Sequence, residues 1–281
     1  MSAPAKSRRY AAVLAYDGGA YQGFQRQPKP TPTIQAAIEA AIGQVAAPGS
    51  SIVGAGRTDA GVHASGQVIA FDIEWNHGDD DLLRAINAQL PPDIALREIW
   101  RRERFHPRYD ALWRQYAYRI ATPATRNPLL ARYVWQLTGE SLELDRMNAA
   151  AAIILGEHDF AAFGTPPQAG SLNTVRQVFL SSWELESGTF GAAYRYRIRG
   201  TAFLYHMARR LVGMMAQVGR GAISLGEFEA ILRSRELSRT KTLAPPCGLV
   251  LEAVGYPGVT ETETTTRAAE QVMMAALEGR I

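Results

Sequence analysis

One aspartate, Asp59, stands in a sequence setting that suits covalent chemistry. It lies within residues 54–63, and glycines at positions 54, 56, 61 and 66 surround it. Glycine permits positive φ and close approach of another chain, so this loop can hold the Asp59 carboxylate against a ligand backbone. A nucleophilic carboxylate must be ionised, and a nearby guanidinium favours that form. The pattern predicts a catalytic role for Asp59.

Two arginines are candidate partners for the Asp59 carboxylate. Arg57 lies two residues before it, and Arg209 interrupts the apolar helical periodicity of residues 203–218. Because a buried arginine needs a carboxylate partner, we expect Arg209 to pair with Asp59 in a cleft between two halves of the chain. The alternatives are a solvated or structural ion pair between Arg57 and Asp59 and an Arg209 side chain that snorkels to water.

Tyr116 and His63 are weaker candidates. Tyr116 has Arg114 and Arg119 nearby, which suits an aromatic platform for a nucleobase, although a strand tyrosine is more often part of a core. His63, four residues after Asp59, could act in acid–base chemistry. With no visible orienting group, the favoured interpretation is a hydrogen-bonding role within the loop.

The charge distribution indicates a polyanionic partner. The net charge is only +3, yet all but three of the 30 basic residues are arginine, and the pI is about 9.1. A GC-rich coding bias would explain the choice of arginine but not its clustering. Clustered arginine interleaved with aromatic residues is typical of a nucleic-acid surface. One basic segment has eight arginines against two acidic residues, and a second has six against none: 101, 102, 104, 108, 114, 119, 126 and 132; then 195, 197, 199, 209, 210 and 220.

Several functional classes are disfavoured. The single cysteine, Cys247, and five histidines without close spacing predict no metal site. The glycines near Asp59 lack the dinucleotide-binding pattern, and no P-loop occurs, so no cofactor is expected. No uncharged apolar run approaches the ~18 residues of a membrane helix. We therefore expect a soluble protein of the reducing cytoplasm.

The hydrophobic patterns predict the order β-α-β-β-α-β twice over. The first half has strands near 10–16, 51–55, 69–75 and 94–100, with helices near 34–45 and 82–90. The second half has strands near 116–120, 175–185, 192–199 and 249–254, with helices near 147–155 and 203–218. This order predicts an α+β fold of duplicated ferredoxin-like halves with antiparallel or mixed sheets. The predicted domains are 8–105 and 106–257, followed by a tail at 258–281.

The segment Gly56-Arg57-Thr58-Asp59-Ala60-Gly61-Val62-His63-Ala64 resembles the active-site motif of the tRNA pseudouridine synthase A (TruA) family. Further resemblance runs in order over about residues 9–257. Its motifs are Tyr16-Asp17-Gly18, Tyr21-x-Gly23-Phe24-Gln25-Arg26-Gln27, Asn87-x-x-Leu90-Pro91, Phe105-His106-Pro107-Arg108, Arg114-Gln115-Tyr116-Ala117-Tyr118, Gly156-Glu157-His158-Asp159-Phe160, Phe203-x-x-His206-Met207-x-Arg209 and Ala244-Pro245-x-x-Gly248-Leu249.

The resemblance implies an enzyme that isomerises uridine to pseudouridine at positions 38, 39 and 40 of the tRNA anticodon stem-loop, without metal or cofactor. It implies that Asp59 is the nucleophile, Tyr116 lies against the target base and Arg209 pairs with Asp59. Arg57 would help to shape the site. It also implies a cytoplasmic homodimer that holds tRNA across both subunits. We further expect substrate contacts from Arg26, Gln27 and His63.

Three places depart from the family pattern, all in regions expected to contact RNA. Gly164-Thr165-Pro166-Pro167 lacks a basic residue, Tyr205 replaces a common second histidine, and Leu172-Asn173-Thr174 replaces a more basic stretch. Two other functions stay open. A non-catalytic tRNA- or RNA-binding protein would use the same arginines, and a carboxylate-based hydrolase would need Asp17 or Asp110 as a second acid or base.

Overall fold

The computed structural model describes residues 7–28, 31–46, 50–166, 173–188 and 191–257. Residues 7–112 and 251–257 form a first compact unit, and residues 113–250 form a second. The domain limits at 8–105 and 106–257 stay a prediction. The predicted tail at 258–281 lies outside the described residues.

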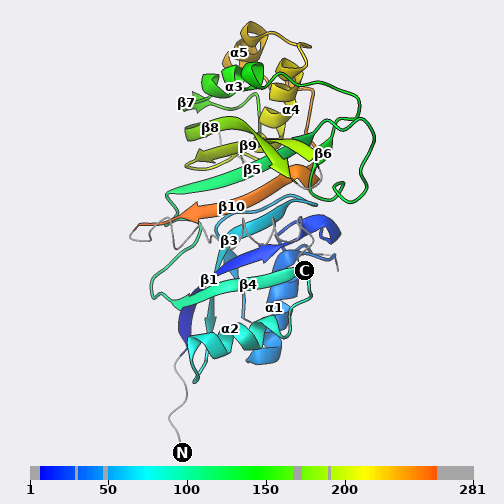
Figure 1. The fold of residues 1–281 in the computed structure, drawn as a ribbon. Helices are drawn as coiled ribbons and strands as arrows, with labels where there is room; N and C mark the ends of the chain where they lie inside the picture. Colours follow the sequence, from blue (N-terminus) through cyan, green and yellow to red (C-terminus); the bar gives the residue numbers. More distant parts are fainter. Residues whose placement is uncertain (1–6, 29–30, 47–49, 167–172, 189–190, 258–281) are drawn as a thin grey trace, which may run out of the picture. The chain divides into compact units, whose positions relative to one another are not determined.

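The first unit is a four-stranded antiparallel arrangement with two helices. Strand β1 pairs with β3 and β4, and the short β2 pairs with β3. Helices α1 and α2 lie on the same side of these strands (Figure 1). The expected β-α-β-β-α-β order is therefore confirmed here. The elements are β1 (Arg8–Tyr16), α1 (Ile34–Val45), β2 (Val53–Gly54), β3 (His63–Ile73), α2 (Asp79–Asn87) and β4 (Ile94–Arg101).

Local sequence signals account for these elements. Residues 10–14 of β1 are almost fully buried, because this strand has a neighbour on each side in the middle of the unit. Thr33 caps α1, as its hydroxyl accepts the Ala36 N–H. Asn87 ends α2 and ties it to β4, since its amide both donates to and accepts from the Leu96 backbone at 2.8 Å.

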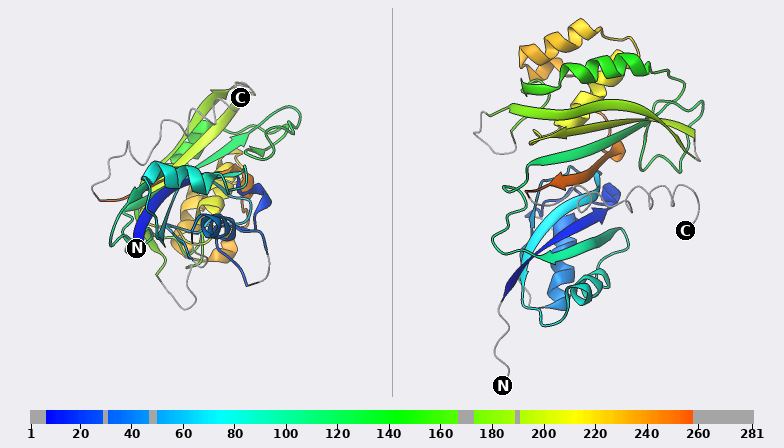
Figure 2. Two further views of the ribbon diagram at one scale, coloured as in Figure 1. Left: turned by 90° about the horizontal axis from the view of Figure 1, so that it is seen from below. Right: turned by 60° about the vertical axis from the view of Figure 1, so that its left-hand side comes forward.

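The second unit repeats the pattern with additions. Its strands lie in the order β5-β9-β8-β7, with antiparallel neighbours, and β6 runs parallel to β5. Helices α3, α4 and α5 lie on the same side of these strands (Figure 2). The elements are β5 (Trp113–Ala121), β6 (Trp135–Gln136), α3 (Leu144–Ile153), β7 (Gly156–Asp159), β8 (Val175–Gly188), β9 (Gly191–Gly200), α4 (Met207–Gly219) and α5 (Leu225–Ser234). Strand β10 (Leu249–Gly255) starts in this unit and continues into the first, where it lies beside β3.

Strand register separates an apolar face of the second unit from an arginine-rich face. Tyr116 pairs with Ile198 and Tyr118 with Tyr196, so both tyrosines of β5 lie on one face, as predicted. On that face Tyr196 stacks on Trp183 at 4.9 Å between ring centroids. The alternate residues of β9, namely Arg195, Arg197 and Arg199, lie on the other face.

The α+β class is confirmed, but some element limits and elements differ from the sequence-based predictions. The last long helix begins at Met207 and not near residue 203, because Tyr205 forms a β-bridge with Thr165 that holds this stretch extended. Helix α5 was missed, although Ser224 and Glu227 form a capping box with the S-x-x-E spacing. The short strands β6 and β7 were missed as well.

Candidate active site and RNA-binding residues

Asp59 lies in the connection between β2 and β3, which is anchored at both ends. The Ala55 N–H donates to the Val68 carbonyl at 2.8 Å, and the Gln67 side-chain amide donates to the Gly56 carbonyl at 3.0 Å. The Asp59 carbonyl accepts the Val62 N–H at 3.1 Å, which closes a turn just after the carboxylate. Asp59 itself is half-buried. The loop therefore presents this side chain from a fixed backbone.

The segment after β1 packs directly against this loop. The Phe24 N–H donates to the Thr58 carbonyl at 3.1 Å, and the Tyr16 and Thr58 hydroxyls lie 2.8 Å apart in a buried hydrogen bond. Gly23 has φ +91°, and a Cβ atom there would lie only 2.9 Å from the Thr58 carbonyl oxygen. The expected close approach and positive φ are confirmed at two of the loop's own glycines: a Cβ atom at Gly54 would lie 2.7 Å from the Phe24 ring, and Gly61 has φ +76°. Gly56, in contrast, has open space around it. Sequence reasoning missed the close approach at Gly23, in the Tyr21-x-Gly23-Phe24 motif.

His63 is buried and supports the loop that follows β1. Its Nδ1 atom accepts the Gly18 N–H at 3.1 Å and lies 3.1 Å from a carboxylate oxygen of Asp17. Because the Gly18 N–H occupies the Nδ1 lone pair, the contact with Asp17 is a close approach and not a salt bridge. This geometry matches the hydrogen-bonding interpretation of His63.

Arg57, Arg26 and Gln27 are exposed residues of the first unit. Within the part of the chain that the structure describes, the Arg57 side chain makes no hydrogen bond or ion pair, so the expected ion pair with Asp59 is absent there. Arg26 pairs with Glu39 at 3.0 Å, and the Gln27 side-chain amide donates to the Gln22 carbonyl at 2.9 Å. Arg57 therefore offers an uncompensated positive charge two residues from Asp59.

The second unit contains Tyr116 and Arg209, and both are buried. Tyr116 is 9% exposed and packs edge-to-face against Phe203, with 4.9 Å between ring centroids. Arg209 is 8% exposed, and its Nε–H donates to the Ala244 carbonyl at 2.8 Å. Sequence reasoning expected a buried Arg209 on this helix, and the structure buries it. Its pairing with Asp59 stays a prediction.

The second basic segment is partly neutralised by strand pairing. Arg195 lies 2.8 Å from Glu186 on the neighbouring strand β8, and Arg197 lies 3.1 Å from Glu184. Arg220 pairs with Glu140. The charge count along the sequence missed these pairs because the acidic partners come from other elements. Arg210 has no carboxylate partner among the described residues.

The residues invoked for hydrolysis have other roles in the structure. Asp17 accepts the Gly19 N–H at 2.9 Å, and Asp110 accepts the His106 N–H at 2.9 Å, so each carboxylate shapes its own loop. Burial raises the pKa of the Cys247 thiol, which disfavours a reactive thiolate.

Two features are absent from the described residues. No three His, Cys, Asp or Glu side chains gather in a way that could hold a metal ion. None of the described helices is long and apolar enough to cross a membrane.

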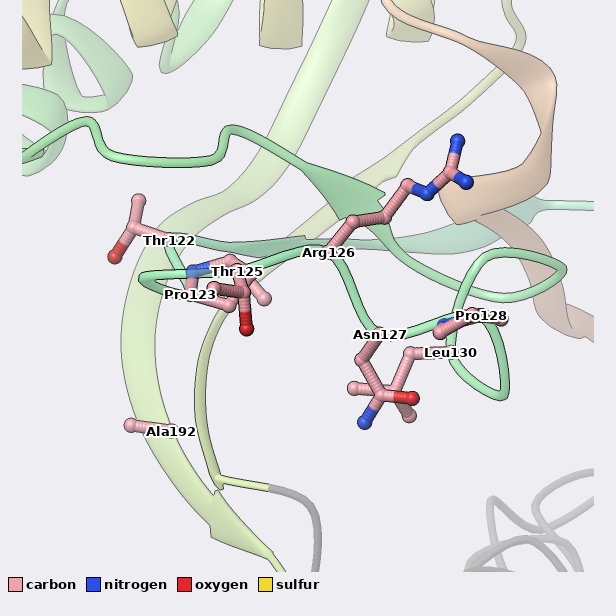
Figure 3. Close-up of a pocket in the computed structure, with 9 residues that line it drawn as sticks. Thr122, Pro123, Thr125, Arg126, Asn127, Pro128, Leu130 and Ala192 are labelled. Carbon is pink, nitrogen blue, oxygen red and sulfur yellow. The ribbon is translucent and has the colours of Figure 1, made fainter.

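A cavity of about 480 Å³ lies in the second unit, and none of the residues predicted to act is among its lining residues. Its lining contains two threonines, one arginine and no carboxylate, and the Arg126 side chain extends away from the threonines (Figure 3). The Asn127 backbone is already bonded to the Gln136 amide at 2.7 Å and 2.6 Å. The lining residues are Ala121, Thr122, Pro123, Thr125, Arg126, Asn127, Pro128, Leu130 and Ala192.

Comparison with known proteins gives a consistent result. A family model described as tRNA pseudouridine synthase matches residues 12–110 and 150–257. A tRNA pseudouridine synthase A of Neisseria meningitidis serogroup B is 36% identical over 257 residues, covering 90% of this chain and 94% of the relative. Proteins of the same name from Bordetella parapertussis and Myxococcus xanthus are 39% and 38% identical, covering 89% and 88% of this chain and 91% and 92% of the relatives.

Among solved structures, this chain is similar to a chain of a Cbf5-Nop10-Gar1 complex. The match covers 95% of this chain and 56% of the other chain. The TM-score is 0.35 and the sequence identity is 12%. A likeness at this level is too weak to carry an argument about fold or function.

Proposed function

The chain belongs to the tRNA pseudouridine synthase family, an isomerase family acting on tRNA, and we propose how and where it acts. The proposed reaction converts uridine to pseudouridine at positions 38, 39 and 40 of the anticodon stem-loop. One observation carries the proposal: the Asp59 loop, which lies inside the matched residues and is fixed by Gly23, Phe24 and Tyr16.

Asp59 is the proposed nucleophile. In the isomerisation, the bond between sugar C1′ and base N1 breaks and a bond between C1′ and C5 forms. The C5 proton is lost and N1 gains a proton, so the product has the same composition as the substrate. Because the carboxylate attacks and later leaves, it is unchanged at the end of the cycle. The rigid loop supports this role, since it holds the nucleophile in place before the substrate arrives.

The target uridine must leave the base stack to reach Asp59. We propose that Tyr116 lies against the flipped base and that Arg209 pairs with the Asp59 carboxylate and keeps it ionised. The exposed Arg57 guanidinium, which has no partner among the described residues, suits a contact with an RNA phosphate. Arg26 and Gln27 extend this proposed surface. His63 would serve it indirectly through the Asp17–Gly19 loop.

We also propose that the protein acts in the cytoplasm as a homodimer, with tRNA held across both subunits. Light scattering coupled to gel filtration tests the oligomeric state, with and without tRNA. A mass of one chain in both samples would contradict the dimer.

The test of the reaction is a map of pseudouridine in unmodified tRNA by mass spectrometry, for the wild type and Asp59→Asn. The proposal predicts pseudouridine at 38–40 with the wild type and none with Asp59→Asn, while tRNA binding persists. Asp80→Asn changes an exposed aspartate on α2 and serves as the control. Full activity of Asp59→Asn would contradict the nucleophile. No pseudouridine from a folded, tRNA-binding wild type would favour the non-catalytic alternative.

A further inference from the structure

A stacked pair of rings lies just before helix α4. The Tyr205 and His206 ring centroids are 3.7 Å apart, with 28° between the ring planes. Tyr205 is 53% exposed, which is high for a large aromatic residue. In this arrangement His206 covers one face of the Tyr205 ring, so the exposed area of the ring is available to another molecule.

The backbone of this pair is held from both sides. The Tyr205 N–H donates to the Thr165 carbonyl at 2.8 Å, and the two residues form an isolated β-bridge. Gly164 packs against the Tyr205 backbone, since a Cβ atom at residue 164 would lie 2.7 Å from the Tyr205 carbonyl oxygen. His206 has φ +66°, which turns the chain into α4. A ring on such a backbone loses little conformational entropy when a ligand stacks on it.

An uncompensated guanidinium lies one helical turn further on. The Arg210 N–H donates to the His206 carbonyl at 3.0 Å. The Arg210 Nε atom is buried and has no hydrogen-bond partner within residues 7–28, 31–46, 50–166, 173–188 and 191–257, and its side chain has no ion pair there. Burial is the main cause of a lowered Arg210 pKa, and the nearby Tyr205 acts in the opposite sense. Arg195, Arg197 and Arg220 differ, because each has a glutamate partner.

We propose that Tyr205 is a stacking platform for an unpaired nucleobase of the tRNA and that Arg210 contacts a phosphate of the same nucleotide. Stacking on aromatic side chains is how proteins hold bases that have left a helix. A guanidinium provides donors that match a phosphate. The proposal rests on the proposed function in one respect, that tRNA is the substrate.

The test measures the affinity of wild type, Tyr205→Ala and Tyr205→Phe for an anticodon stem-loop RNA at several salt concentrations. Loss of base stacking predicts about 5- to 160-fold weaker binding for Tyr205→Ala. The slope of log affinity against log salt should not change, because no charge is removed. Tyr205→Phe keeps the ring and should bind within about twofold of the wild type. Phe179→Ala removes a ring of similar exposure, 51%, from β8 and should bind like the wild type.

Arg210→Gln tests the phosphate contact separately. It should reduce the salt slope by about 0.7 to 0.9, the value for one phosphate contact. Stem-loops that carry 2-aminopurine at single positions add a structural readout. One position should show quenching by the wild type and Tyr205→Phe that is lost with Tyr205→Ala. Thermal unfolding establishes that each variant is folded.

Three outcomes would overturn the platform. They are wild-type affinity of Tyr205→Ala, weak binding by Tyr205→Phe as well, and an unchanged quenching profile. Pseudouridine formation by the wild type, assayed in parallel, separates this proposal from the proposed function. If the wild type forms pseudouridine and Tyr205→Ala binds normally, only the platform fails. If the wild type forms none and Tyr205→Ala still loses affinity and quenching, only the reaction fails.

Discussion

The Asp59 loop and the Tyr205–Arg210 segment are both held rigidly, but by different means. The Asp59 loop is fixed from the neighbouring β1 and its following turn, through the Thr58 carbonyl and hydroxyl. The Tyr205 segment is fixed by Thr165, which lies forty residues earlier in the chain, through a single bridge. The first holds the proposed nucleophile, and the second holds a proposed RNA contact. Disturbing the first should therefore impair the chemical step, and disturbing the second should impair binding.

The largest effect is expected from Gly23→Ala, which should disturb the Asp59 loop and slow the chemical step. The new Cβ would lie 2.9 Å from the Thr58 carbonyl oxygen, and φ is +91°, so the loop that carries Asp59 must move. A displacement of about 1 Å at a catalytic group costs about 100-fold in rate. We expect kcat to fall by about that factor, measured under single-turnover conditions with saturating enzyme. Gly43→Ala in α1 meets no atom within 4 Å and should leave kcat unchanged.

Gly164→Ala applies the same chemical change to the other region. Its Cβ would lie 2.7 Å from the Tyr205 carbonyl oxygen, so it should shift the proposed platform. We expect about fivefold weaker tRNA binding, the lower end of the effect of losing one stacked base, with an unchanged kcat. Steady-state assays over a range of tRNA concentrations separate the two parameters. A fall in kcat as large as that of Gly23→Ala would contradict a role of the Tyr205 segment in binding alone.

The smallest effect is expected at the start of α5, outside both regions. Glu227 accepts the Ser224 N–H at 2.7 Å, and this hydrogen bond lowers the pKa of the Glu227 carboxyl from 4.5. Because the pKa of this carboxyl is lower in the folded than in the unfolded state, its ionised form stabilises the fold at pH values above the unfolded-state pKa. This stabilisation is lost as the pH falls through the folded-state pKa. Urea unfolding at pH 7 and pH 4 measures how much stability each protein loses at the lower pH. Glu227→Gln should lose slightly less than the wild type, because it lacks the carboxyl group that becomes protonated. Equal acid sensitivity in both proteins would contradict this assignment.

The contrast between the two regions also explains what could be predicted from the sequence. The Asp59 loop was predictable because its glycines and its hydrogen-bonding partners lie within short motifs of the same unit. The turn at Tyr205 was not, because apolar periodicity continues through residues 203–206 and only the bridge from Thr165 prevents the helix from starting there. The glutamates on β8 that pair with Arg195 and Arg197 are only 9 and 13 residues away, across the β8–β9 hairpin, and the charge count missed them because it covered only the basic segment itself. Contacts distant in sequence, such as the bridge from Thr165, leave no local signal.

The role of Asp59 is tested most directly by release of the C5 proton. Unmodified tRNA that carries tritium at uridine C5 would be mixed with excess wild-type protein or Asp59→Asn, and tritium in water measured over time. If Asp59 is the nucleophile, the wild type should release tritium, and Asp59→Asn should release it at least about 10³-fold more slowly at saturating enzyme. Release by Asp59→Asn at the wild-type rate would contradict the central role of this carboxylate.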